Sequence, residues 1–200
     1  MNIGIFGGAF NPVHNGHLNL AKNYFIDLNL DKIIFIPTSV PPHKTSDNLA
    51  DAQDRINMLS LAVSDNRDYE ISTIEFERTG KSYTYDTLRQ LRSIYPDDKF
   101  FLIIGADQFM TFHHWYKYES ILQMVTICTS AREDENEKKR MLDYAKSIPA
   151  FDGKYYICDK PVLKLSSSMV RSKVKNNEDI SSLVPYKVCD YISEKGLYRV

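Results

Sequence analysis

The chain of 200 residues has no long apolar run. No stretch approaches the roughly 20 residues that a membrane-spanning helix needs, and the first residues have neither the basic segment nor the apolar core of a secretory signal. We therefore expect a cytoplasmic protein that has no membrane partner.

Cysteine is also scarce, and the three that occur stand far apart at Cys128, Cys158 and Cys189. An odd number of cysteines without a C-x-x-C pair argues against a disulfide framework and against a zinc cluster. Each cysteine is expected to be a small buried hydrophobic residue.

An excess of charge of one sign is missing too, because 25 Lys and Arg stand against 26 Asp and Glu. The basic residues are interleaved with acidic ones, so no broad cationic face for duplex nucleic acid is predicted. No linker rich in Pro, Gly or Ser is present, and no period of about 20 to 50 residues recurs. The sequence predicts one domain over 1–200, with a C-terminal helical part at about 166–200 packed on it.

Short apolar runs alternate with amphipathic segments along the chain. The runs predict strands at about 3–7, 32–37, 69–74, 100–105, 125–129 and 155–158. The amphipathic segments predict helices at about 15–28, 54–63, 84–94 and 133–145, a helix near 167, and a last one between Pro185 and Gly196. This alternation predicts an α/β fold of the Rossmann-like, doubly wound type, with a mainly parallel sheet and helices on both faces.

The first 17 residues carry the strongest functional signal. A β-branched run ends in a turn at Gly7 and Gly8, and His14 and His17 then lie three residues apart where a helix begins. A helix start attracts anions, and ligands of open α/β sheets bind beyond the carboxyl ends of the strands. A lone histidine at a helix start is more often a cap, but the pair behind a glycine turn favours a phosphate site.

Two segments that are far apart in the chain resemble signatures of one superfamily. Residues 7–17 are similar to the H-x-G-H element of the nucleotidyltransferases, and residues 165–171 resemble its I-S-S-T-x-I-R element. Residues 41–44, 54–59, 82–88 and 104–107 narrow the resemblance to bacterial-type nicotinate-nucleotide adenylyltransferases. This likeness spans nearly the whole chain. It implies transfer of AMP from ATP to nicotinate mononucleotide, which gives nicotinate adenine dinucleotide and pyrophosphate in NAD biosynthesis.

Such a transfer needs no protein nucleophile, so positioning and charge stabilisation carry the catalysis. The resemblance and the chemistry of phosphate binding together give an expected ATP site of Gly7, Gly8, Ala9, Phe10, His14, His17, Gly105, Asp107, Ser167, Ser168 and Arg171. The candidate catalytic residues are His14, His17, Lys44 and Arg171. For Asp107, Ser167 and Ser168, a role as helix caps remains open beside ligand binding.

The acceptor site implied by the resemblance comprises Asn11, His43, Lys44, Tyr83, Thr84, Trp115, Tyr116 and Arg132. Trp115 would stack on the charged pyridine ring, and donors near Thr84 and Tyr116 would meet its carboxylate. His43 and Lys44 would close as a lid, although Lys44 also fits a solvated charge and Trp115 a core residue. Arg132 precedes Glu-Asp where many relatives have Arg-Pro-Gly, which leaves its role open.

Magnesium is expected to travel with ATP on phosphate oxygens and water, because the sequence shows no cage of carboxylates. The rival interpretations are another adenylyl- or cytidylyltransferase of the superfamily, a nucleotide sensor without chemistry, and a dehydrogenase. The interpretation as a dehydrogenase is disfavoured because the spacing G-x-G-x-x-G is absent. Homo-oligomer formation and the degree of preference for an acid over an amide acceptor stay open.

Overall fold

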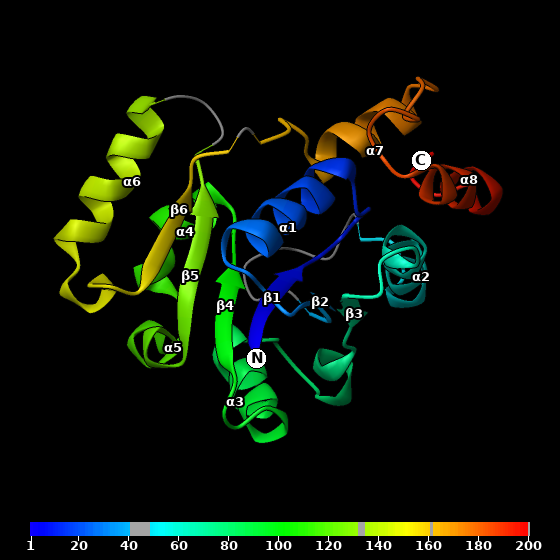
Figure 1. Ribbon diagram of the computed structural model, residues 1–200. Helices are drawn as coiled ribbons and strands as arrows, with labels where there is room; N and C mark the ends of the chain where they lie inside the picture. Colours follow the sequence, from blue (N-terminus) through cyan, green and yellow to red (C-terminus); the bar gives the residue numbers. More distant parts are fainter. Residues whose placement is uncertain (41–48, 132–134, 161, 200) are drawn as a thin grey trace.

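The computed structural model describes residues 1–40, 49–131, 135–160 and 162–199. Six strands form one sheet in the order β3-β2-β1-β4-β5-β6 (Figure 1), and all neighbouring strands are parallel. The strands are β1 (Asn2–Gly8), β2 (Lys32–Pro37), β3 (Tyr69–Ile71), β4 (Lys99–Ile103), β5 (Val125–Ser130) and β6 (Tyr155–Cys158). The parallel α/β architecture predicted from the alternating pattern is confirmed.

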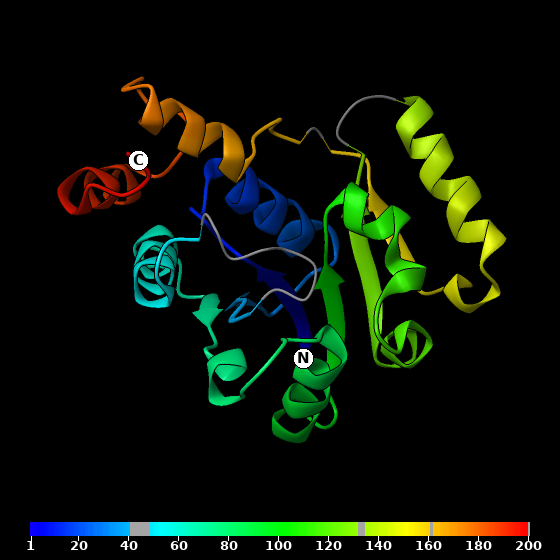
Figure 2. The ribbon, with the colours of Figure 1, turned by 180° about the vertical axis from the view of Figure 1, so that it is seen from behind.

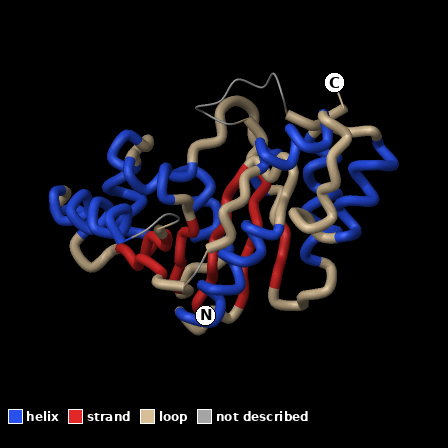
Figure 3. Tube along the Cα trace, turned by 90° about the horizontal axis from the view of Figure 1, so that it is seen from above, coloured by secondary structure: helices blue, strands red, loops and turns tan. Residues whose placement is uncertain are grey.

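Helices lie on both sides of the sheet, as the views from behind and from above show (Figures 2 and 3). They are α1 (Asn15–Asp27), α2 (Ala52–Val63), α3 (Thr84–Ile94), α4 (Ala106–Met110), α5 (Tyr118–Met124), α6 (Glu135–Ser147), α7 (Ser167–Lys175) and α8 (Tyr186–Lys195). Short 3-10 helices occur at Ile74–Glu77, Phe112–His114 and Pro149–Phe151. None of the helices in the described ranges combines the length and the apolar character that crossing a bilayer requires.

Side chains of the central strand β1 point alternately into two cores. Ile3 and Ile5 are buried with apolar side chains of α3, α4, α5 and α6. Phe6 is buried on the opposite face, with side chains of α1, α2, α7 and α8. Burial on both faces is why the strands read as continuous apolar runs in the sequence.

The direction of winding changes beside β1. This strand pairs with β2 on one side and with β4 on the other, so the connections that follow β1 and β4 lead to opposite sides of the sheet. Such a change leaves a crevice outside the carboxyl ends of the two strands, where ligands of open α/β sheets bind. Gly8 ends β1 and Gly105 closely follows β4, which brings both predicted glycine segments to this crevice.

Some elements differ from the prediction. The strand expected over 69–74 ends at Ile71. Ile74 begins a 3-10 helix instead, and the Ile74 side chain is buried in the same core as Ile3 and Ile5. As an edge strand, β3 pairs with β2 over only three residues. Helix α5 was not predicted, because its seven residues are too few to show a helical period. The expected helix start near 133 lies outside the described residues, and α6 begins at Glu135.

The three cysteines are free thiols. Cys128 and Cys158 are buried, as predicted, whereas Cys189 on α8 is only half-buried. Burial raises the pKa of the Cys128 thiol, so it behaves as an apolar core side chain.

Candidate active site

A cavity of about 830 Å³ opens at the carboxyl ends of β1 and β4. This volume falls within the range of about 300 to 1,000 Å³ that is usual for ligand sites. The predicted site residues that line it are Gly7, Gly8, Ala9, Phe10, Asn11, His14, His17, Tyr83, Thr84, Gly105, Asp107, Trp115, Tyr116, Ser167, Ser168 and Arg171. The remaining predictions, His43, Lys44 and Arg132, lie outside the described residues.

The two predicted histidines form the start of α1 together. His14 is the N-cap, one residue before the helix, and His17 is the third helical residue. The backbone N–H of His17 donates to Nδ1 of His14 at 3.3 Å, and the backbone N–H of His14 donates to Nδ1 of His17 at 3.2 Å. This is a capping box built from imidazoles, where serine and glutamate are the usual pair.

The capping box also determines which ring nitrogen carries the proton. A backbone N–H can only donate, so Nδ1 of each ring must accept, and the proton of each neutral imidazole resides on Nε2. The rings of His14 and His17 are stacked with centroids 3.6 Å apart. The Phe10 ring lies against His17 at 5.1 Å and restricts its rotation. Both histidines can therefore act as Nε2 donors at the cavity.

Gly16, between the two histidines, leaves room for this stacked pair. A Cβ atom at Gly16 would stand 3.0 Å from Nδ1 and Cε1 of His14 and 3.2 Å from Cβ of Leu165. These distances are shorter than ordinary van der Waals contacts. Glycine is thus required for the close approach of the His14 ring and of the segment before α7.

The segment that begins α7 is hydrogen-bonded to the turn after β1. Ser167 donates from Oγ to the carbonyl of Pro12 at 2.8 Å, and Arg171 donates from Nη1 to the carbonyl of Asn11 at 2.8 Å. Arg171 also donates from Nη2 to Oγ of Ser168 at 3.2 Å. Two sequence motifs about 150 residues apart therefore lie in direct contact at one cavity.

The capping roles considered for Ser167, Ser168 and Asp107 are wrong. Ser166 is the N-cap of α7, and its Oγ accepts the backbone N–H of Met169 at 3.1 Å. Gly105 is the N-cap of α4, which leaves Asp107 inside the first turn of that helix with an exposed side chain. The three predicted residues are thus available to the cavity they line.

Arg55 is a buried cation that is hydrogen-bonded to three segments around the cavity. Its guanidinium Nη1 donates to the carbonyl of Ala9 at 2.9 Å and to that of Thr38 at 2.7 Å, while Nε donates to the carbonyl of Ala50 at 3.2 Å. The residue is 2% exposed, and burial lowers its pKa although Tyr198 and Glu75 oppose that shift. The turn after β1 and the segments on either side of 41–48 are thereby fixed relative to each other.

The opposite side of the cavity is aromatic. The Tyr83 and Tyr116 rings lie 4.9 Å apart, and the Trp115 ring packs 5.0 Å from Phe112 of the core. Tyr83 is the N-cap of α3 and makes no side-chain cap bond, so the helix start at Thr84 faces the cavity without such a cap. This arrangement places aromatic rings beside the positive end of a helix.

The buried carboxylate of Glu75 accepts a hydrogen bond from the first turn of α3. Glu75 is 6% exposed and lines the cavity. Its Oε1 accepts the Thr87 hydroxyl at 2.9 Å, and its Oε2 accepts the backbone N–H of Ser39 at 3.3 Å. Glu75 therefore links the first turn of α3 to the segment that follows β2.

Sequence reasoning missed Gly16, Arg55, Glu75 and Ser166 as contributors to the site. Gly16 and Ser166 lie inside the two motifs, so their positions were a usable signal. Arg55 and Glu75 stand on other elements and reach the cavity only through long-range hydrogen bonds. Arg55 belongs to the segment 54–59 that resembles the family, so its position was a usable signal, whereas nothing in the local sequence marks Glu75.

No group of three or more His, Cys, Asp or Glu side chains is arranged to hold a metal ion within the described part of the chain. Nδ1 of both histidines accepts a backbone N–H, so Nε2 of each neutral ring carries the proton and cannot ligate a metal. The donor set of the cavity therefore suits an anion better than a cation.

A family model described as cytidylyltransferase-like matches residues 5–173. A probable nicotinate-nucleotide adenylyltransferase of Geobacillus thermodenitrificans (strain NG80-2) is 40% identical over 196 residues, which cover 98% of this chain and 85% of that protein. The nicotinate-nucleotide adenylyltransferase of Bacillus subtilis (strain 168) is 37% identical over 197 residues, which cover 98% of each chain.

Two solved structures are similar in fold. One is a Plasmodium falciparum nicotinic acid mononucleotide adenylyltransferase complexed with NaAD, with a TM-score of 0.79 at 22% identity, covering 98% of this chain and 97% of that one. The other is a putative nicotinate-nucleotide adenylyltransferase from Vibrio parahaemolyticus, with a TM-score of 0.71 at 24% identity, covering 99% and 95%. The two structures share the fold of this chain, and the family model and the sequence relatives place it in the cytidylyltransferase-like family and, within it, among the nicotinate-nucleotide adenylyltransferases.

Proposed function

We propose that this protein transfers the adenylyl group of ATP to nicotinate mononucleotide, which forms nicotinate adenine dinucleotide and pyrophosphate in NAD biosynthesis. The observation that carries the proposal is the convergence of the His14–His17 pair and the start of α7 on one cavity. The identity of close to 40% with adenylyltransferases of this specificity supports the choice of substrates. The cytoplasm, which supplies ATP, is the compartment that we propose.

In this reaction an oxygen of the acceptor phosphate attacks the α-phosphorus of ATP while the bond to pyrophosphate breaks on the opposite side. The electron pair of the broken bond leaves with pyrophosphate, so no covalent enzyme intermediate is needed. The protein must hold two polyanions together and stabilise the charge that grows on the phosphate oxygens.

His14 and His17 are assigned to the α-phosphate. Their Nε2–H groups are fixed in direction by the capping box, so they need little reorganisation to donate to developing charge. Backbone N–H groups of the turn from Gly7 to Phe10 are assigned to the phosphates as well. A Cβ atom at Gly7 would meet no protein atom within 4 Å and would point into open space.

The start of α7 is assigned to the β- and γ-phosphates. The hydroxyls of Ser167 and Ser168 and the guanidinium of Arg171 line the cavity beside the helix start, which favours negative charge. Asp107 and Gly105, beyond β4, are assigned to the ribose of ATP, because a carboxylate accepts hydrogen bonds from sugar hydroxyls.

The aromatic side of the cavity is assigned to the acceptor. Trp115 would stack on the cationic pyridine ring, and the start of α3 at Thr84, with Tyr83 and Tyr116 nearby, would receive the carboxylate. Asn11, whose backbone carbonyl accepts a hydrogen bond from Arg171, lines the cavity and is assigned to the mononucleotide. His43, Lys44 and Arg132 remain proposed from the sequence resemblance.

Magnesium fits this site as a companion of the triphosphate, not as a protein-bound ion. No cluster of metal-ligating side chains is found in the described ranges, so phosphate oxygens and water would hold the ion. When bound there, it would neutralise part of the phosphate charge.

The test incubates the purified protein with ATP, magnesium and either nicotinate or nicotinamide mononucleotide, and measures pyrophosphate and dinucleotide together. Loss of the acceptor carboxylate removes a charged hydrogen-bond partner worth about 1.5 to 3 kcal/mol, so the acid should react roughly ten- to 150-fold faster in terms of kcat/KM. Parallel reactions with CTP in place of ATP, and with phosphopantetheine as the acceptor, test the rival cytidylyl- and adenylyltransferase activities. Equal rates with the acid and the amide would contradict the assignment of the carboxylate donors. Product formed only with another pair of nucleotide and acceptor would overturn the proposed function.

A further inference from the structure

Tyr198, in the segment after α8, makes a hydrogen bond across the fold to the turn that follows β1. Its hydroxyl donates to Oδ1 of Asn11 at 2.8 Å. The backbone of Tyr198 has φ of 64°, a left-handed conformation that non-glycine residues rarely take and that surrounding contacts must hold. The hydrogen bond links the segment after α8 to a residue that lines the cavity.

The surroundings of the Tyr198 hydroxyl keep it a donor. Burial raises its pKa, and the nearby Arg171 and Arg55 guanidiniums oppose that shift only in part. The group therefore stays protonated at neutral pH. The Asp54 carboxylate raises the pKa further, and the proton of the hydroxyl is donated to Oδ1 of Asn11.

The side-chain amide of Asn11 is oriented by two donors, of which the Tyr198 hydroxyl is one. Its Oδ1 accepts the Tyr198 hydroxyl and also the backbone N–H of Ala50 at 3.0 Å. A backbone N–H can only donate, so the oxygen must occupy this position and the NH₂ end must point the other way. The backbone carbonyl of Asn11 is held in turn by Arg171. Asn11 is 4% exposed and lines the cavity.

We propose that Tyr198 is a positioning residue of the active site, whose hydroxyl, together with the Ala50 N–H, holds the Asn11 amide in the orientation that receives the acceptor mononucleotide. The inference rests on the proposed function, because it assigns Asn11 to the acceptor. It makes the segment after α8 part of the working site, although that segment contributes no group to the substrates.

The test compares Tyr198→Phe with Tyr191→Phe, a matched control. Tyr191 belongs to α8. Its hydroxyl donates to Asp54 at 2.8 Å and accepts from Asn57 at 2.9 Å, and neither partner lines the cavity. Each variant loses one hydroxyl. We expect Tyr198→Phe to raise KM for nicotinate mononucleotide about fivefold, the effect of one neutral hydrogen bond, with KM for ATP changed less than twofold. Tyr191→Phe should leave both KM values unchanged and lower only the melting temperature.

A double-mutant cycle with Asn11→Ala adds a second readout. If Tyr198 acts through Asn11, the Tyr198→Phe change should have almost no effect on KM once the amide is gone. An effect of equal size in both backgrounds would overturn the proposal, as would a Tyr198→Phe enzyme whose two KM values match those of the wild type, or in which both rise together. If the wild type forms no dinucleotide, the proposed function and this inference fall together; if it is active and Tyr198→Phe is unchanged, only this inference falls.

Discussion

Arg171 donates a hydrogen bond from Nη1 to the backbone carbonyl of Asn11, at 2.8 Å and across 160 positions of the sequence. This contact joins the part of the cavity assigned to the triphosphate to the residue assigned to the acceptor. The guanidinium also reaches Ser168, so it is fixed at two points and its remaining N–H groups are directed by the protein.

Replacing Arg171 with lysine should lower kcat/KM for ATP about tenfold or more, because an ammonium group cannot reproduce the planar fork that contacts Asn11 and Ser168 together. Steady-state kinetics with ATP as the varied substrate measures the change. Lys173→Ala, on the same helix, is the control: Lys173 pairs with Glu178 on the surface and should leave the kinetics unaltered. Wild-type kinetics for Arg171→Lys would contradict the phosphate assignment.

Replacing His17 with alanine should lower kcat by about 100-fold or more, the effect of removing one oriented donor to a charged transition state. It should change KM for ATP much less, and it should also lower the melting temperature because the cap is lost. In His17→Asn the side-chain oxygen can still accept the His14 N–H, whereas nothing reaches the Nε2 position. That variant should therefore keep the stability and lose the turnover, and a nearly normal kcat in either variant would remove His17 from the mechanism.

The variant Gly16→Ala separates helix stability from active-site geometry. Alanine favours a helix over glycine by about 1 kcal/mol, so the melting temperature should not fall if the chain relaxes locally. The new methyl group would displace the His14 ring, which lies 3.0 Å from its position. We expect a loss of kcat of tenfold or more in a folded protein, measured by kinetics together with circular dichroism. Full activity would show that the His14 ring has no fixed role.

Ser166→Ala should reduce stability with little effect on catalysis. Its hydroxyl oxygen caps α7, and the loss of such a cap corresponds to about 1 kcal/mol, or a fall of roughly 2 to 4 °C in the melting temperature of a protein of this size. Ser167→Ala provides the comparison, because that hydroxyl contacts the turn after β1 and should affect kcat more than stability. Thermal unfolding and kinetics on both variants decide whether the two serines are interchangeable.

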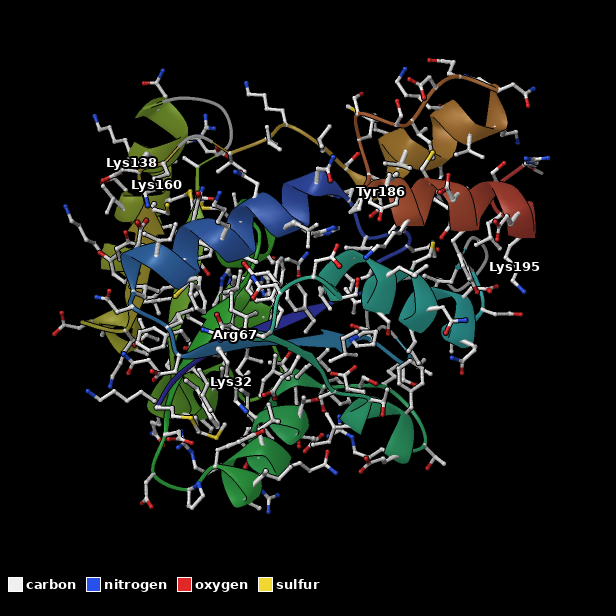
Figure 4. All side chains as sticks on the ribbon, turned by 45° about the vertical axis from the view of Figure 1, so that its right-hand side comes forward. Lys32, Arg67, Lys138, Lys160, Tyr186 and Lys195 are labelled. Atoms are coloured by element: carbon white, nitrogen blue, oxygen red, sulfur yellow. The ribbon has the colours of Figure 1, made fainter. Side chains whose placement is uncertain are left out.

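Asp27 should make stability sensitive to acid. Burial works against its ionisation, but hydrogen bonds from Lys160, Cys158 and Tyr156 outweigh that effect and hold the pKa of Asp27 below its ordinary value of 3.8. Lys160, labelled in Figure 4, also forms an ion pair with this carboxylate. Because the pKa is lowered on folding, the stabilisation is complete above about pH 5 and is lost as the pH falls through the folded-state pKa.

The measurement for Asp27 is the melting temperature of wild type and Asp27→Asn between pH 3 and pH 7. The variant should melt roughly 2 to 4 °C lower at pH 7, and the two curves should approach each other below about pH 4. Parallel curves over the whole range would show that the carboxylate charge has no part in stability. Lys173→Ala, whose partner Glu178 is exposed, serves as a second control.

The sheet, most helices and the location of the cavity were predictable because they follow from local patterns. Buried strands read as apolar runs, and the glycine turn with its two histidines marks the carboxyl end of β1 at the change in winding. The family prediction is confirmed by the sequence relatives. The roles of individual site residues stay predictions, and those of His43, Lys44 and Arg132 concern residues that the structure does not describe.

The sequence did not reveal which serine caps α7, nor the hydrogen bonds between residues that are far apart in the chain. Ser166, Ser167 and Ser168 are chemically identical neighbours, and only the geometry of α7 decides that the first is the cap. Arg55 lies in a segment that resembles the family, but its contact with the carbonyl of Ala9 could not be read from that segment, nor could the contact of Tyr198 with the amide of Asn11. Such contacts are made by the fold as a whole, so no local window of sequence contains them.

The imidazole capping box gives the site a natural spectroscopic label. Because Nδ1 of His14 and of His17 accepts a backbone N–H while Nε2 carries the hydrogen, the two nitrogens of each ring should resonate as distinct unprotonated and protonated types in ¹⁵N NMR. Occupation of the cavity by a polyphosphate would shift the protonated signals and leave the other pair anchored to the helix. Ligand arrival could thus be followed at the two histidines assigned to the α-phosphate, without a fluorophore or a coupled enzyme.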